Sequence, residues 1–207
     1  MRSRPNSRGA QLRSAALVLA AGASRRLGRP KQLLPYGDGV ILDAVLDTAR
    51  DSGVDQVVVA LGGSAEAVRQ VVDLTGVDAV ENPEYGTGCS SSIATAIPAL
   101  HPQVDVLVLL LGDQPGVRAE TVRQLLYRRG DSSIAVCRYD DGIGHPFAFD
   151  RRVLPALREL HGDKAVWKLL DQRAAEVTEV RIDGPIPLDV DTEADYGRLL
   201  AGLRSAR

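Results

Sequence analysis

The chain has 207 residues, of which 44% are hydrophobic and 25% are charged, and its formal net charge is −2. This length suits one sizeable hydrophobic core and is short for two ordinary domains. The slightly negative balance argues against nucleic acid as a partner, and no apolar run approaches the roughly 20 residues of a membrane-spanning helix. We therefore expect one domain over residues 15–207, with small anions as ligands and with neither nucleic acid nor a membrane as a partner.

The first 14 residues are predicted to form a disordered basic tail. They carry Arg2, Arg4, Arg8 and Arg13 among serine, proline and glycine, and they lack the apolar centre of a secretion signal. Cys89 and Cys137 lie far apart, and neither belongs to a C-x-x-C motif or a Cys/His cluster. These features indicate reduced thiols in a cytoplasmic protein, without a zinc site or a disulfide framework.

Strand and helix patterns alternate along the chain. Apolar runs predict strands over 16–19, 56–61, 77–80, 104–111, 133–138 and 177–182. Helical spacing predicts helices over 40–50, 65–74, 90–100 and 119–128, a pair within 151–172, and a last helix from Thr192. Such βα units predict a three-layer α/β/α sandwich with a mostly parallel, doubly wound, Rossmann-like sheet, whose ligands bind at the carboxyl ends of the strands.

The first strand runs directly into a loop of small and basic residues. The loop holds Gly22, Gly28, Arg25, Arg26 and Lys31. Glycine lets backbone N–H groups approach an anion, and the cations supply countercharge, so the loop is predicted to bind phosphate. Five residues separate the two glycines, and Gln32 follows Lys31, so the spacing fits neither a P-loop nor the G-x-G-x-x-G fingerprint of dinucleotide sites.

The use of lysine gives a second indication about this loop. Only Lys31, Lys164 and Lys168 are lysines, whereas all the other basic side chains apart from histidine are arginines. A lysine kept inside a glycine-containing loop of such a chain indicates a need for a compact ammonium, which a planar guanidinium does not replace. Lys31 is therefore expected to contact phosphates.

Two acidic segments are candidate metal ligands. Asp113 follows the most hydrophobic run, where a lone carboxylate can bind magnesium that shares its shell with waters and phosphates; capping of the following helix is the alternative. Asp189 and Asp191 share one face if their segment is extended. Capping of the last helix explains Thr192 and Asp195 but not the two aspartates before them.

Three further positions are open to both a functional and a structural interpretation. The segment with Gly86, Gly88 and Ser90–Ser92 opens a helix, and its donors suit a nucleobase edge or a phosphate as well as ordinary capping. Cys89 is interpreted as a small buried residue rather than a nucleophile. Trp167 is interpreted as a core anchor of its helix, with a stacking surface as the alternative.

Several of these segments resemble one known family. Residues 15–31 resemble the signature L-A-A-G-x-S-x-R-M-G-x-x-K of the MobA-like nucleotidyltransferases, with Leu27 in the methionine position. Residues 112–115 resemble its G-D-Q-P motif, and residues 189–192 its D-x-D-T motif. Gly144-His145-Pro146 resembles the G-H-P motif of the molybdenum cofactor cytidylyltransferase branch. Residues 162–167 depart from that branch's G-D-x-G-A-R loop, because the second glycine and the arginine are missing.

The resemblance implies transfer of CMP from CTP, or GMP from GTP, to the terminal phosphate of molybdopterin or the molybdenum cofactor, with Mg²⁺ as cofactor and a molybdenum hydroxylase apoprotein as a further partner. The implied catalytic residues are Lys31, Arg25 and Asp113, and the implied metal ligands are Asp113 and Asp191. The implied nucleotide-binding residues are Leu19, Ala20, Ala21, Gly22, Ser24, Arg25, Arg26, Lys31, Gly86, Ser90 and Ser91. The implied acceptor residues are Gly144, His145, Pro146 and Asp189.

Other functions stay open beside cytidylyl transfer. They are guanylyl transfer, transfer to another phosphorylated metabolite, and non-catalytic carriage of the finished cofactor. Residues 20–22 read Ala-Ala-Gly as in the cytidylyl branch, and the methyl group of Ala21 narrows the floor on which a nucleotide lies. The combination of Lys31, Asp113 and Asp191 argues against a pure carrier, which needs no metal and triphosphate site.

Overall fold

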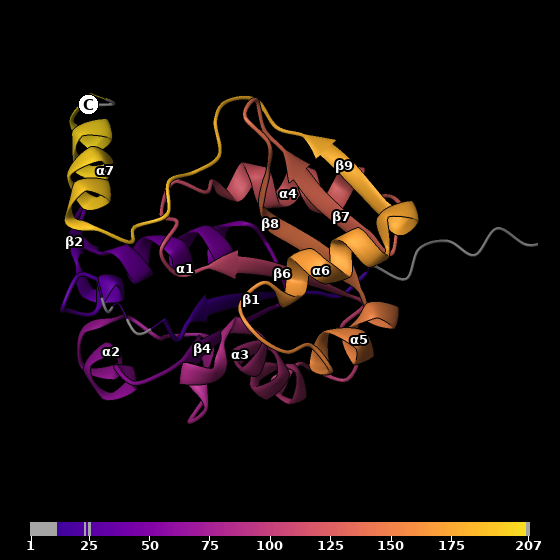
Figure 1. The fold of residues 1–207 in the computed structure, drawn as a ribbon, viewed down its shortest axis with the longest axis horizontal. Coiled ribbons are helices and arrows are strands. Elements are labelled where there is room, and N and C mark those ends of the chain that lie inside the picture. The colour runs from indigo at the N-terminus through magenta and orange to yellow at the C-terminus, as the bar shows by residue number, and fades with distance from the viewer. Residues whose placement is uncertain (1–11, 23, 25, 206–207) are drawn as a thin grey trace, which may run out of the picture.

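The computed structural model describes residues 12–22, 24 and 26–205. Seven strands form one sheet in the order β5-β4-β1-β6-β8-β7-β9 (Figure 1). These strands are β1 (Ser14–Ala20), β4 (Gln56–Leu61), β5 (Val77–Glu81), β6 (Val106–Leu111), β7 (Ile134–Arg138), β8 (Ile143–Asp150) and β9 (Val177–Arg181). Strand β8 runs antiparallel to β6 and β7, and the other paired strands of this sheet are parallel. The predicted, mostly parallel sheet is confirmed.

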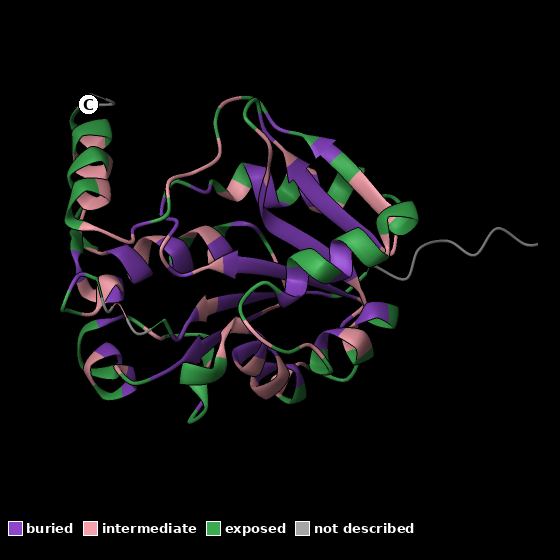
Figure 2. Ribbon diagram, viewed as in Figure 1, coloured by how far each residue is buried: buried purple, intermediate pink, exposed green. Residues whose placement is uncertain are grey.

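Helices cover both faces of this sheet, which confirms the three-layer sandwich (Figure 1). One face packs against α1 (Ile41–Asp51), α2 (Ala65–Val71) and α4 (Ala119–Arg128). The other face packs against α3 (Cys89–Ala96), α5 (Leu154–Arg158) and α6 (Ala165–Gln172). Because both faces are covered, the central strands are continuously apolar and lie in the buried interior (Figure 2).

The chain ends in α7 (Glu193–Ser205), which lies apart from the two helical layers (Figure 1). Its residues Tyr196 and Leu199 pack on a small cluster of Leu27, Leu34, Ile41 and Val190. A short hairpin of β2 (Pro35–Tyr36) and β3 (Gly39–Val40) lies on the same side, and the Tyr196 hydroxyl donates to the carbonyl oxygen of Pro35 at 2.7 Å. This packing fixes the segment before α7 against the loop that follows β1.

Strand β8 was not among the predicted elements. Its first half contains Gly144, His145 and Pro146, a composition that interrupts the alternation of a strand. The pairing with β7 shifts at this point, from Val136↔Phe147 to Cys137↔Gly144, so His145 and Pro146 form a bulge. A bulge tolerates proline because its residues have no ladder partner to supply with an N–H donor.

Two other sequence expectations are refined by the structure. The helix pair expected within 151–172 consists of the short α5 and of α6, separated by a loop over 159–164. Residues 1–11 of the predicted tail lie outside the described residues, whereas Ser14 already pairs with Val106 in the sheet. Within the part of the chain that the structure describes, no helix combines the length and the apolar character needed to cross a membrane.

Candidate functional site

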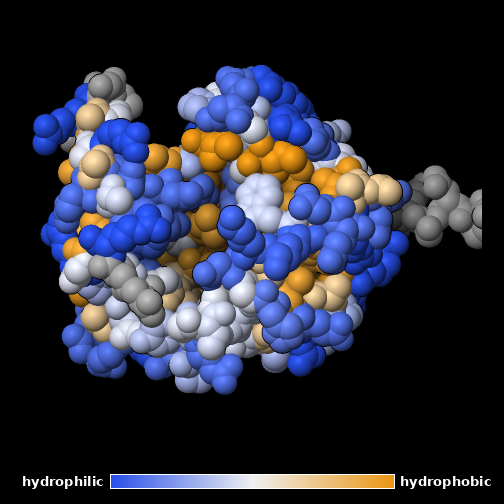
Figure 3. All heavy atoms as spheres, viewed as in Figure 1, coloured by the Kyte–Doolittle hydropathy of each residue, from blue (hydrophilic) through white to orange (hydrophobic). Residues whose placement is uncertain are grey.

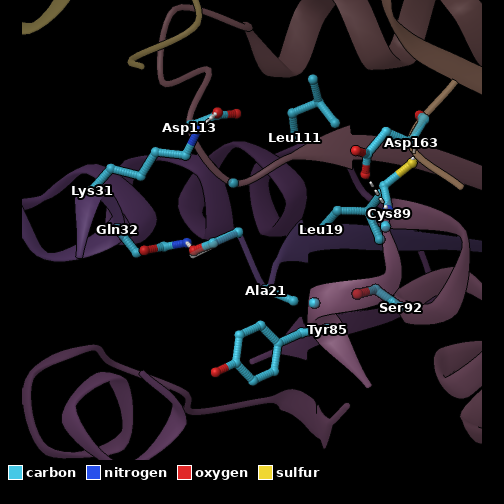
Figure 4. Close-up of a pocket in the computed structure, with 14 residues that line it drawn as sticks. Leu19, Ala21, Lys31, Gln32, Tyr85, Cys89, Ser92, Leu111, Asp113 and Asp163 are labelled. Atoms are coloured by element: carbon cyan, nitrogen blue, oxygen red, sulfur yellow. Dashed lines mark hydrogen bonds and ion pairs between the residues drawn. The ribbon is translucent and has the colours of Figure 1, made fainter. Parts of the chain in front are cut away.

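A cavity of about 350 Å³ opens at the carboxyl ends of β1 and β6 (Figure 4). This is the edge at which the sequence placed the two motif-bearing loops, and its volume lies within the range of small-molecule sites. Its walls come from four regions of the chain: the ends of β1 and β6 with the loops after them, the loop leading into α3, and the loop before α6. The lining residues are Leu19, Ala21, Gly22, Lys31, Gln32, Tyr85, Gly86, Gly88, Cys89, Ser92, Leu111, Gly112, Asp113 and Asp163.

The loop after β1 is held by its own hydrogen bonds. Ser24 has a φ of 48°, an uncommon value for a residue other than glycine, and its carbonyl oxygen accepts from the N–H groups of Leu27 and Gly28. The Ser24 hydroxyl accepts from the Lys31 N–H at 3.0 Å, and the Gln32 amide donates to the Ala20 carbonyl oxygen at 2.8 Å. These contacts close the loop and fix Lys31 at the rim of the cavity.

The Lys31 ammonium lies between two carboxylates. It donates to Asp113 Oδ2 and, at 2.8 Å, to Asp191 Oδ1. The side chains of Lys31 and Asp113 are only 13% and 15% exposed, so solvent screens this pair weakly. On its outer side Asp191 also accepts from the exposed guanidinium of Arg26 at 3.3 Å. Asp113, Asp191 and two of the predicted cations therefore meet, while Arg25 lies outside the described residues.

Electrostatics keep this cluster charged. Burial lowers the pKa of Lys31, but the charges and hydrogen bonds of Asp113 and Asp191 outweigh it and raise this pKa above the usual value. The hydrogen bond from Lys31 holds the pKa of Asp191 below its usual range. The ammonium and the Asp191 carboxylate therefore both stay ionised at neutral pH, and the cation offsets the repulsion between the two aspartates.

The segment before α7 is docked by backbone contacts. Val190 is fully buried, and its N–H donates to the Asp113 carbonyl oxygen at 3.2 Å. Thr192 and Asp195 bond reciprocally, with Asp195 Oδ2 accepting from the Thr192 N–H at 2.8 Å, so the predicted helix start is confirmed.

Desolvation of the Asp189 carboxyl group, together with nearby Asp113, raises the pKa of Asp189 to about 6.

The two carboxylates at Lys31 fit a hard divalent cation. Asp113 and Asp191 already converge on one positive charge, and carboxylate oxygens are ligands that magnesium and manganese accept. Among residues 12–22, 24 and 26–205 no set of three or more His, Cys, Asp or Glu side chains is arranged to hold a metal ion. The pair therefore suits a metal that takes its remaining ligands from water and phosphates.

The helix α3 presents a different serine from the ones predicted. Ser90 and Ser92 are both 3% exposed, and Ser91 donates its hydroxyl to the Gly88 carbonyl oxygen at 2.8 Å; of the three serines, Ser92 lines the cavity. Asn82 donates to both Ser91 and Ser92, which ties the helix start to the end of β5. Successive residues of a helix point about 100° apart, so a shift of one position decides which serine faces the cavity.

The far wall of the cavity comes from the loop before α6, which the sequence had not assigned to the nucleotide side. Asp163 Oδ1 accepts from the Cys89 N–H at 3.2 Å, and the Cys89 thiol donates to the Asp163 carbonyl oxygen at 3.0 Å. Gly88 has a φ of 118°, and a Cβ there would lie 2.8 Å from the carbonyl carbon of Gly162. Burial, and then the charge of Asp163, raises the pKa of Cys89, which therefore stays a neutral thiol.

None of the predicted acceptor residues Gly144, His145, Pro146 and Asp189 lines the cavity. Gly144, His145 and Pro146 form the bulged start of β8, and His145 is 9% exposed. Burial lowers the pKa of His145 to about 4, so its ring is neutral at physiological pH. The interpretation of Trp167 as a core anchor was wrong, since it is 40% exposed.

Comparisons with known proteins identify the family of this chain. The sequence model of the MobA-like NTP transferase domain matches residues 16–177. The chain belongs to the MobA-like NTP transferase family. It is accordingly a nucleotidyltransferase by family, and the resemblance noted in the sequence is confirmed.

Two of the proteins that this chain resembles are nicotine blue oxidoreductase and the mycobacterial protein Rv0371c. Nicotine blue oxidoreductase of Paenarthrobacter nicotinovorans is 33% identical over 194 residues, which cover 89% of this chain and 95% of that protein. The crystal structure of Rv0371c from Mycobacterium tuberculosis H37Rv is 49% identical, with a TM-score of 0.86 over 92% of this chain and 98% of that one. A structure of Rv0371c in complex with manganese is 46% identical, with a TM-score of 0.83 over 91% and 98% of the two chains.

A first prediction concerns Lys31. Replacing Lys31 by Arg should reduce nucleotidyl transfer almost as much as replacing it by Ala, because a planar guanidinium does not fit the narrow space between Asp113 and Asp191. Steady-state rates of both variants measure this. Lys168→Arg, an exposed change on α6, is the matched control and should keep the wild-type rate. A Lys31→Arg variant with the wild-type rate would contradict the argument.

A second prediction concerns His145 and pH. Its pKa is about 4 in the folded protein and about 6.5 when unfolded, so between these values the unfolded chain binds more protons and stability falls as the pH falls. The full effect is at most about 3 kcal/mol. Urea unfolding at pH 4.5 and 7 should show that His145→Gln loses part of this dependence. Equal pH dependence of the unfolding free energy in His145→Gln and in the wild-type protein would refute the prediction.

Proposed function

We propose that this protein transfers CMP from CTP to the terminal phosphate of molybdopterin, or of molybdopterin that already carries molybdenum. An oxygen of that phosphate attacks the α-phosphorus of CTP. The bond from this phosphorus to the bridging oxygen of the β-phosphate breaks, and pyrophosphate leaves. The attacking phosphate is already anionic at neutral pH, so the reaction needs charge neutralisation and positioning rather than a general base.

The observation that carries the proposal is the Lys31 ammonium between Asp113 and Asp191 at the rim of the cavity. In the proposed reaction Lys31 and the arginines of the loop after β1 contact the triphosphate, and Gly22 lets the backbone approach it. Positive groups held in place before the reaction stabilise the charge that develops on the phosphates.

Asp113 and Asp191 would hold a divalent cation, with Mg²⁺ as the proposed ion. When bound, such a cation neutralises charge on the phosphates. The manganese complex of Rv0371c, a protein 46% identical to this one, supports a metal in this family member as well. Because the Lys31 ammonium contacts both carboxylates, a cation held by Asp113 and Asp191 would take over part of the charge neutralisation that Lys31 supplies in this structure.

The choice of CTP rests on the floor of the cavity. Ala21 lines the cavity and is 7% exposed, and its carbonyl oxygen lies 2.5 Å from the position of a Cβ at Gly62. The loop around Ala21 is therefore closely packed and does not recede easily. An additional methyl group in such a pocket costs about 1–3 kcal/mol, which favours the smaller pyrimidine.

For the acceptor, the proposal relies on Gly144, His145 and Pro146 beside the cavity and on Asp189. The product would then pass to a molybdenum hydroxylase apoprotein, and the free thiols Cys89 and Cys137 suit a cytoplasmic reaction.

We also propose that residues 15–207 act as one catalytic domain. The identity to a protein named nicotine blue oxidoreductase makes a redox reaction the alternative. The paired carboxylates at Lys31 favour metal and triphosphate chemistry.

A third prediction tests the proposed function. Pyrophosphate release is measured with molybdopterin and each of CTP, GTP, ATP and UTP, and CTP should give the highest kcat/KM, by about ten-fold or more over GTP. Ala21→Gly should narrow this ratio, since it removes the methyl group from the floor. Ala201→Gly on the surface of α7 is the control. GTP turnover equal to or above that of CTP would move the assignment to guanylyl transfer, and no release with any nucleotide would reject transfer to molybdopterin.

A further inference from the structure

Trp167 is the only tryptophan of the chain. Its side chain packs against other aromatic rings but stays partly exposed to solvent. The indole packs edge-on against Phe147, with ring centroids 5.3 Å apart and an interplanar angle of 90°. His145 stacks on Phe147 at 4.1 Å and meets Trp167 at 6.3 Å. Tryptophan is highly buried on average, so 40% exposure of a ring supported in this way indicates a surface kept available.

The pairing of the strands places these three rings next to the nucleotide cavity. Leu19 of β1 pairs with Leu111 of β6, and both line the cavity. Leu109 pairs with Phe147 of the antiparallel strand β8. The His145 ring stacks on that of Phe147, so it lies on the face of the sheet that Phe147 shares with Leu109. The cavity and the aromatic cluster are neighbours along one edge of the sheet.

The loop before α6 fixes Trp167 relative to the cavity. Asp163 lines the cavity and accepts a hydrogen bond from the Cys89 N–H, so the start of α6 is tied to the start of α3. In Figure 4 Asp163 and Cys89 lie on the side of the cavity away from Lys31. Trp167 lies in the first turn of α6, four residues after Asp163.

We infer that Trp167 is the wall of a second subsite, adjacent to the nucleotide cavity, on which the flat heteroaromatic ring of the acceptor stacks. The inference rests on the proposed function. The nucleotide then lies on the β1 side of Leu111 and the acceptor ring on the β8 side. Asp113 follows the end of β6 between them, which is where the acceptor phosphate has to meet the α-phosphate.

The chemistry of the cluster suits a neutral aromatic ring. His145 stays uncharged because burial lowers its pKa to about 4, so the three rings offer an apolar and polarisable surface. Apolar residues gather around the hollow on this face of the molecule (Figure 3). The exposed large hydrophobic side chains of the described residues are scattered over separate elements, at Leu12, Val71, Tyr85, Tyr127 and Trp167. Scattered side chains do not make the continuous patch of a protein interface.

A fourth prediction tests the inference by kinetics. Trp167→Leu should raise the KM for molybdopterin by about ten-fold or more, as loss of a stacking partner does, with the KM for CTP unchanged. Trp167→Phe keeps a flat ring and should restore most of the affinity. Tyr127→Leu removes an 88% exposed ring from α4, on the opposite face of the sheet, and is the matched control. An unchanged molybdopterin KM in Trp167→Leu, or equal rises in both KM values, would overturn the inference.

A binding experiment separates this inference from the proposed reaction. The wild-type protein is labelled with 5-fluorotryptophan, which gives one ¹⁹F signal, and titrated with 6-hydroxymethylpterin without nucleotide. The signal should shift with the pterin and not with ribose 5-phosphate, which has no aromatic ring. No shift up to the solubility limit of the pterin would overturn the inference even if CTP is turned over. A shift in a protein that transfers no nucleotide would support the subsite while the proposed function fails.

Discussion

One cation between two carboxylates organises the site. Lys31 comes from the loop after β1, Asp113 from the end of β6 and Asp191 from the segment before α7, and the ammonium of Lys31 holds all three together. Two aspartates fixed this close by a rigid strand and a buried Val190 repel each other unless positive charge lies between them. Lysine supplies that charge in the structure, and a divalent ion bound with the triphosphate would supply it in the reaction.

Asp113 lies at the end of β6, between two different parts of the sheet edge. The loops after the parallel strands β1 and β5 line the cavity together with the end of β6, while the antiparallel strand β8 and helix α6 carry the aromatic cluster on the other side of β6. Asp113 stands at the boundary, where Gly112 has little space, since a Cβ there would lie 2.9 Å from that of Ala20. In the proposed reaction, two substrates placed on either side would meet at Asp113 without sharing a pocket.

The sequence made Lys31, Asp113 and Asp191 candidates for one site. Lys31 and Asp113 follow apolar runs, and a parallel sheet brings the ends of such runs to one edge. Asp191 stands directly before a well-marked helix start. Strand β8 could not be predicted from the sequence, because Gly144 and Pro146 interrupt the alternating pattern of a strand. Its register also depends on pairing with the distant strand β6 and with β7. Which serine of α3 lines the cavity depends on how this helix packs on the sheet, and Ser92, although only 3% exposed, is the one that does. Asp163 reaches the cavity through contacts with Cys89, 74 residues away, and the partial match of residues 162–167 to a family loop did not indicate this contact.

The most direct test of the two-carboxylate site is the affinity for Mn²⁺, measured by electron paramagnetic resonance with α,β-methylene-CTP present. Asp113→Asn and Asp191→Asn should each weaken binding by about ten-fold or more, and the double variant should lose little beyond the single ones, because both side chains serve one ion. Asp183→Asn, at a fully exposed side chain, is the control. Unchanged Mn²⁺ affinity in either single variant would contradict a shared cation at Asp113 and Asp191.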